Sequence, residues 1–276
     1  MICIPMTIIV ATDFSEIAEN AVEYAAAIAK HSNAKLILYN SFDISIHAAN
    51  TLLPGSSFQK LLNENEIRLI ERSLSLSIDY DIEVGHESAL SFVEDEIKIL
   101  IAKYDVALVV LGMNTKTLEQ DLWGYTTTTV IKKLKLPVLA VPLGAKFVGV
   151  KKVLFACDVL SGVSEKVLLN VKELALSLDA EVEVFNVNRV LNEIKRAADL
   201  SDTHVIDDGL EGISYYYKQV KSNTVIKEIR KEIEIFGADM LIMVPKKYGF
   251  WTSLVHISKT RIMASGLQIP LLSIPI

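Results

Sequence analysis

Runs of apolar and β-branched residues alternate along the chain with longer amphipathic segments, a pattern typical of a parallel α/β fold. The first run, 6–12, ends at Asp13-Phe14-Ser15 and precedes an alanine-rich helical pattern that continues through Lys30. A continuous apolar run of this length predicts a strand that is buried on both faces. The chain is therefore expected to open with a buried strand that leads into a helix.

The same alternation continues through the first half of the chain. It predicts strands at 34–40, 80–85, 106–111 and 137–142, and helices at about 57–78, 90–103 and 125–135. Strands that alternate with helices of this length imply right-handed crossovers and a parallel sheet covered by helices on both faces. We expect the alternating strand at 80–85 to lie at an edge of that sheet.

The second half repeats the order of the first. The apolar run 153–157, closed by Asp158, corresponds to 6–12; the run 180–186 corresponds to 34–40; and 270–275 corresponds to 137–142. The repeat predicts two domains, 1–145 and 146–276. In the second we expect strands at 153–157, 180–186, 213–220, 239–244 and 270–275, helices at 161–177, 224–236 and 253–265, and a partly irregular helical region at 189–212.

Composition limits the possible function classes. With 276 residues, 51% of them hydrophobic, the chain can build two domains with separate cores. A net charge of −6 without a basic stripe argues against general nucleic-acid binding. The start lacks the basic residues of a secretory signal, and no apolar run approaches the roughly 18 residues of a membrane span, so we expect a cytoplasmic protein with no membrane contact.

The strand ends carry the candidate chemistry. In open parallel sheets, ligands bind beyond the carboxyl ends of the strands, where the strand order reverses. Asp13, Asn40, Ser41 and Gly112 lie at such ends. Neither G-x-G-x-x-G nor G-x-x-x-x-G-K-[ST] is present, so the two common phosphate loops are excluded.

A glycine and a run of hydroxyl residues precede the last helix of the first half. Gly124-Tyr125 is followed by the four threonines 126–129. Unpaired N–H groups at a helix N-terminus attract anions, and hydroxyls add further donors. The alternative is that these residues only start the helix, as hydroxyl residues commonly do. Both interpretations stay open on the sequence.

Taken together, four segments resemble the universal stress protein family: A-T-D-F-S after the first strand, L-G-M-N-T after the fourth, G-Y-T-T-T before the last helix, and P-V-L-A-V-P at the close. The resemblance covers nearly the whole chain, once per half. It implies two tandem five-stranded parallel-sheet domains of the Rossmann-like, adenine nucleotide α-hydrolase-like class, related by a pseudo-twofold axis.

The resemblance also implies a ligand, namely ATP or another adenine nucleotide, with or without Mg²⁺. The nucleotide-binding branch of the family has the loop G-x2-G-x9-G-[S/T]; here Thr115 stands in place of the second glycine, eight residues separate it from Gly124, and Tyr125 takes the hydroxyl position. The residues that would line the ligand are Ala11, Thr12, Asp13, Ser41, Leu111, Gly112, Asn114, Thr115, Gly124, Tyr125 and Thr126.

The second half departs further from this pattern. Its fourth strand ends without the glycine, the segment 245–251 (P-K-K-Y-G-F-W) replaces the loop, and His256 lies near the position of Gly124. A proline supplies no N–H donor, and two rings fill space, so this loop suits a closed pocket or a contact surface. We expect a degenerate phosphate loop there.

The resemblance finally implies an assembly. The closing strands 138–141 and 271–274 would pair across the pseudo-twofold axis, as two single-domain chains do in a dimer, and a further homodimer is conceivable. No G-x-S-x-G elbow, H-E-x-x-H motif or histidine cluster with metal spacing is present, so a dedicated catalyst is not expected.

Three functions stay open. The first is a nucleotide-binding regulatory or protective protein that responds to stress through a protein partner, with slow ATP hydrolysis as an option. The second is an interaction scaffold for a protein or an apolar ligand, without nucleotide. The third, an adenine-dependent ligase or transferase, is the least favoured because the sequence offers neither a nucleophile nor a metal-ligand cluster.

Overall fold

A computed structural model describes residues 6–41, 55–89, 93–113, 127, 129–131, 133–157, 162–188, 201–244 and 267–276. It divides into two compact units: the described residues up to Lys146 form the first, and those from Phe147 onward form the second. Each unit is an α/β structure built on a parallel sheet, as the sequence predicts. No helix in the described part of the chain is both long enough and apolar enough to cross a bilayer.

The sheet of the first unit has the order β3-β2-β1-β4-β5. All of its strand pairs are parallel. The strands are β1 (Thr7–Thr12), β2 (Lys35–Ser41), β3 (Val84–Ala89), β4 (Val106–Met113) and β5 (Val138–Pro142). The chain moves outward from β1 to β3 and then returns to the other side of β1, so the strand order reverses between β1 and β4.

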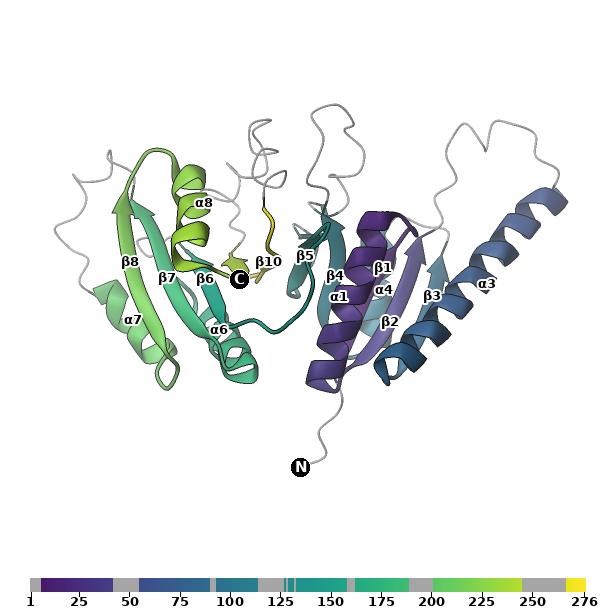
Figure 1. Ribbon diagram of the computed structural model, residues 1–276, viewed down its shortest axis with the longest axis horizontal. Coiled ribbons are helices and arrows are strands. Elements are labelled where there is room, and N and C mark those ends of the chain that lie inside the picture. Colours follow the sequence, from purple (N-terminus) through teal and green to yellow (C-terminus); the bar gives the residue numbers. More distant parts are fainter. Residues whose placement is uncertain are drawn as a thin grey trace. The chain divides into compact units, whose positions relative to one another are not determined.

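Helices cover both faces of this sheet. They are α1 (Glu16–Ser32), α3 (Gly55–Tyr80) and α4 (Val93–Lys103). Figure 1 shows α1, in dark purple, in front of the strands and α4 behind them. Val10, Leu38 and Val109 on the three central strands are fully buried, as expected of a sheet covered on both sides.

The second unit has the order β10-β9-β6-β7-β8, also entirely parallel. Its strands are β6 (Lys152–Ala156), β7 (Glu181–Asn188), β8 (Tyr215–Lys221), β9 (Met240–Met243) and β10 (Leu271–Ser273). Its helices are α6 (Glu165–Leu178), α7 (Ser201–Gly209) and α8 (Val225–Phe236). Within each unit, the first strand in sequence thus lies at the centre of the sheet.

Matching local signals begin and end the first helix of each unit. Ser15 caps α1 by accepting a hydrogen bond from the backbone N–H of Ala18, and Ser164 caps α6 in the same way. Both helices end at a left-handed residue, Asn33 and Asp179 respectively. A short polar residue tolerates that conformation better than a branched one, which explains why each helix stops there.

One predicted strand is misplaced, and several predictions fall outside the described residues. The strand expected at 80–85 begins only at Val84, because α3 continues to Tyr80 and Asp81 then turns with a φ of 53°. Of the helical region expected at 189–212, residues 201–212 are described, and they form α7 (Ser201–Gly209) followed by a turn. The helix at 253–265 lies outside the described residues, whereas residues 127, 129–131 and 133 of the helix expected at 125–135 are described and helical. The pairing of 138–141 with 271–274 and the pseudo-twofold axis stay predictions.

Candidate functional site

Three neighbouring strands of the first unit end along one edge of its sheet. β1 ends at Thr12, β2 at Ser41 and β4 at Met113, and the register pairs Thr12 with Asn40 and Val10 with Val110. Adjacent strands lie about 4.8 Å apart, so the predicted residues that belong to these strand ends are brought together. Those residues are Ala11, Thr12, Asp13, Ser41, Leu111 and Gly112.

The remaining predicted ligand residues lie outside the described part of the chain. They are Asn114, Thr115, Gly124, Tyr125 and Thr126. The site can therefore be built from its strand-end half, while the roles of the phosphate-loop residues stay predictions.

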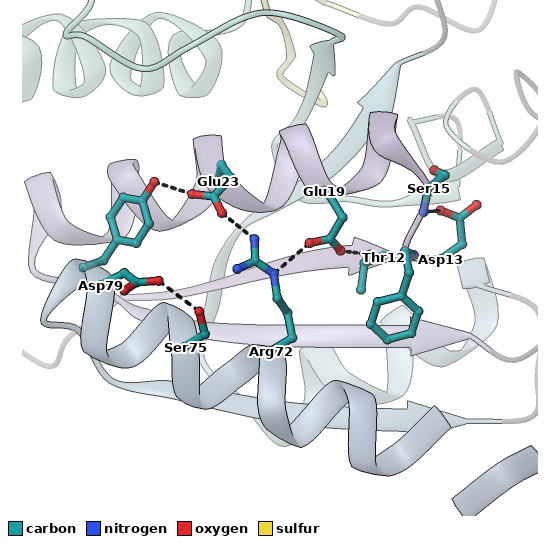
Figure 2. A network of polar contacts seen from close by, with 10 residues as sticks. Thr12, Asp13, Ser15, Glu19, Glu23, Arg72, Ser75 and Asp79 are labelled. Carbon is teal, nitrogen blue, oxygen red and sulfur yellow. Dashed lines mark hydrogen bonds and ion pairs between the residues drawn. The ribbon is translucent and has the colours of Figure 1, made fainter. Parts of the chain in front are cut away.

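Asp13 stands in a turn whose hydrogen bonds are local and well defined. One oxygen of its carboxylate accepts a hydrogen bond from the Ser15 N–H at 2.9 Å, and the side chain is exposed. The N–H of Phe14 donates to the Thr12 hydroxyl oxygen at 2.9 Å, and Phe14 adopts a left-handed φ of 61°. The turn leaves the second carboxylate oxygen of Asp13 directed to the surface, where a ligand hydroxyl group or amine can approach it (Figure 2).

A pair of asparagines ties β2 and α3 to the end of β1. Asn40 donates to the backbone carbonyl of Thr12 at 2.8 Å, and Asn65 of α3 donates to the side-chain oxygen of Asn40 at 2.7 Å. Asn40 is buried, so each of these bonds satisfies a group that would otherwise be costly to bury. The asparagines hold the β1 and β2 ends in register beside Ser41.

Gly112 is required by packing against α1. A Cβ built on Gly112 would lie 2.8 Å from the Cγ2 of Ile17 and 2.9 Å from the Ile17 carbonyl oxygen, closer than real Cβ atoms come. Its own carbonyl accepts a hydrogen bond from the Thr127 hydroxyl at 3.1 Å. The glycine therefore lets β4 approach the first turn of α1, whether or not a phosphate approaches it as well.

α3 contributes side chains to this edge of the sheet that the sequence analysis did not select. The Arg68 guanidinium carbon lies 4.1 Å from the centre of the Phe14 ring, a cation–π contact beside Asp13. Asn65, Arg68 and Arg72 are spaced three and four residues apart, which places them on one helix face. That spacing was a visible signal, but it does not say which strand end the face meets.

The described residues contain no group of three or more histidine, cysteine or acidic side chains that could hold a metal ion. In the second unit the corresponding strand end carries Asn186, which is buried and donates to Asn188 at 3.2 Å. The segment 245–251 and His256 lie outside the description.

Comparisons with known proteins agree with this architecture. The universal stress protein family model matches residues 6–142, which span the first unit. The structure of a universal stress protein from Archaeoglobus fulgidus has a TM-score of 0.74 and 16% identity, covering 97% of this chain and 95% of that chain.

A structure of a putative universal stress protein from Pseudomonas aeruginosa has a TM-score of 0.59 and 14% identity, covering 99% of this chain and 94% of that one. At these sequence identities the two structures show a shared fold and nothing more. A search of curated proteins finds no match. Through its first unit, which the family model matches over residues 6–142, the chain belongs to the universal stress protein family.

Proposed function

We propose that the first unit binds an adenine nucleotide, with ATP as the leading candidate, at the edge formed by the ends of β1, β2 and β4. The observation that carries the proposal is the Asp13 turn, which offers an exposed, pre-oriented carboxylate beside the point where the strand order reverses. Hydroxyl groups of a ribose are suitable donors for such a carboxylate. The phosphates would extend toward Gly112 and the loop at 114–126.

In this proposal the protein is a regulatory or protective nucleotide binder that works through a protein partner. Binding of a nucleotide would stabilise the first unit and bias what its surface offers to that partner. The strand ends described above present neither a nucleophile poised against a general base nor a metal cluster, so hydrolysis would be slow and incidental.

Calorimetry and native mass spectrometry with ATP, with and without Mg²⁺, test this proposal. We expect one nucleotide per chain. Asp13→Ala should bind it more weakly, because the variant lacks the carboxylate that would accept a hydrogen bond from a ribose hydroxyl group. Asp79→Ala is the matched control: Asp79 is also exposed and bonds only a neighbouring serine, Ser75, at 2.9 Å, but it lies near the far end of α3. Gly124→Asp should also abolish binding by placing a negative charge beside the phosphates.

A second candidate function is an interaction scaffold that needs no nucleotide. The packing of Gly112 against Ile17 favours it, because the glycine is explained without any ligand. Under this alternative the wild type shows neither heat nor mass shift with ATP at micromolar concentration, and Asp13→Ala behaves like the wild type in every binding assay. That pair of results would replace the nucleotide proposal.

A further inference from the structure

A chain of polar contacts joins the far end of α3 to the candidate site. On α3, Arg72 donates from Nε to Glu19 at 2.7 Å and from its terminal nitrogen to Glu23, so one guanidinium bridges two carboxylates of α1 (Figure 2). The Tyr80 hydroxyl donates to the other oxygen of Glu23. Arg72 and Glu19 are only 22% and 27% exposed, which strengthens the contact over that of a surface pair.

Within these polar contacts, each charged group stabilises the protonation state that its neighbour needs. Burial alone would lower the pKa of Arg72, but its hydrogen bonds to Glu23 and Glu19 outweigh that and raise the pKa. Burial, followed by the bond to Glu23, raises the pKa of Tyr80 to about 12, so the phenol keeps its proton and stays a donor. Glu19 and Glu23 lie one helical turn apart and would repel each other without the guanidinium.

The other oxygen of Glu19 reaches the strand end. It accepts a hydrogen bond from the Thr12 hydroxyl at 2.7 Å. A hydroxyl has one proton, so once it is given to Glu19 the oxygen can only accept, and it accepts the N–H of Phe14 at 2.9 Å. Thr12 is almost fully buried, so water does not compete readily for either bond.

The Phe14 bond decides the shape of the turn that carries Asp13. Phe14 has a φ of 61°, a conformation that costs free energy for a residue with a bulky side chain. The bond from its N–H to Thr12 offsets that cost, and the next residue, Ser15, bonds Asp13 and caps α1. Loss of the Thr12 bond would let the peptide between Asp13 and Phe14 rotate, and the carboxylate would turn with it.

We infer that Arg72 is a positioning residue for the candidate ligand site: through Glu19 it fixes the Thr12 hydroxyl, which orders the turn 12–15 and so presents Asp13. The part of the inference that concerns affinity rests on the proposed nucleotide binding, whereas the ordering of the turn does not. The alternative is that Arg72 only clamps α3 onto α1, in which case its removal lowers stability but leaves the turn intact.

The experiment compares Arg72→Met, Thr12→Val and the double variant with the wild type. Two quantities are measured: amide hydrogen exchange of Phe14 by NMR in the free protein, and the affinity for ATP by calorimetry. Thr12→Ser keeps a hydroxyl and should therefore keep the Phe14 amide slow to exchange, a readout that does not depend on ligand binding. Ser75→Ala is the matched control, because it removes a hydrogen bond on α3 about one turn from Arg72, and the partner of that bond is Asp79 rather than Glu19 or Thr12.

In Arg72→Met we expect Phe14 exchange to accelerate and ATP to bind about three- to tenfold more weakly, the scale of one net hydrogen bond. The double variant should be no worse than Thr12→Val, because both changes act through the same hydroxyl. Unchanged Phe14 exchange in Arg72→Met, or fully additive losses in the double variant, would overturn the inference. A wild type that binds no ATP would refute the proposed function, and Phe14 exchange would still decide whether Arg72 orders the turn.

Discussion

Either packing against α1 or the approach of a ligand could require a glycine at position 112, and the two explanations predict different behaviour of Gly112→Ala. If packing against Ile17 is the reason, Gly112→Ala forces α1 away from β4 and should destabilise the protein by about 1–3 kcal/mol, the usual cost of overpacking. Chemical unfolding followed by circular dichroism measures this. An alanine variant with unchanged stability but lost ATP binding would show that the ligand, not the helix, requires the glycine.

Glu183 in the second unit is a buried carboxyl group whose hydrogen-bonding capacity is only partly satisfied. It is 7% exposed on β7, and one of its carboxylate oxygens has no hydrogen-bond partner. Burial, followed by the negative charge of Glu232, raises its pKa from 4.5 to about 7. Lys218 bonds Glu232 at 2.5 Å, and Glu183 stays protonated in the folded state below its pKa and only partly protonated near neutral pH.

This raised pKa predicts a pH dependence with a definite sign. Between about pH 4.5 and 7 the unfolded chain releases the Glu183 proton while the folded protein keeps it, so stability falls as the pH rises through that window and levels off above it. Glu183→Gln should remove this fall and gain stability over the wild type at pH 8 relative to pH 5. Urea unfolding at both values measures it.

Glu181→Gln is the matched control for this variant. Glu181 precedes Glu183 by two residues on the same face of β7, is more exposed, and pairs with Lys152 at 3.4 Å. Glu181→Gln should therefore leave the fall in stability between about pH 4.5 and 7 unchanged. If Glu183→Gln also left the profile unchanged, the carboxyl would be ionised in the folded state and the burial argument would be wrong.

At the level of elements, the serine caps make a prediction of their own. Ser15→Ala removes an acceptor from the Ala18 N–H at the start of α1 and should destabilise the protein by about 1 kcal/mol. Ser32→Ala makes the same substitution in the last turn of α1, where the hydroxyl only donates back to the Ile28 carbonyl. That control should be neutral, and equal losses from the two variants would contradict the capping argument.

Elements were predictable where one local signal decides them. Buried strands such as β1 and β4 were predicted from continuous apolar runs, and α1 was predicted from its alanine-rich pattern after Ser15. The start of β3 was not, because alternation at Ile82 and Val84 competes with helical signals that continue to Tyr80. At the end of the helix Tyr80 makes a tertiary hydrogen bond to Glu23, a contact that no local pattern reports.

The candidate site shows the same division. Asp13 and Gly112 could be selected because each lies at the carboxyl end of a buried strand. Glu19, Arg68 and Arg72 could not be selected, since an amphipathic helix shows which residues share a face but not which partner that face meets. The close approach of Ile17 to Gly112 is likewise a tertiary fact, and it gives the glycine a packing role that sequence reasoning had assigned to a ligand.

For the whole molecule, the open question is what the closing strands do. Within the first unit β5 pairs with β4, and within the second β10 pairs with β9. A parallel strand bonded on one side leaves every other N–H unpaired, which invites pairing with another strand. The predicted pairing of 138–141 with 271–274 would satisfy both strands inside one chain.

Hydrogen exchange tests that pairing without any substitution. If the closing strands pair, all amides of 138–141 should exchange slowly, because both sides of β5 are then hydrogen-bonded. β8 is the internal control: of the described strands it pairs only with β7, so alternate amides of Tyr215–Lys221 should exchange fast. Fast exchange at alternate positions of 138–141 would contradict the pairing. Protection that depends on protein concentration would point to pairing between chains, because only an intermolecular contact weakens on dilution.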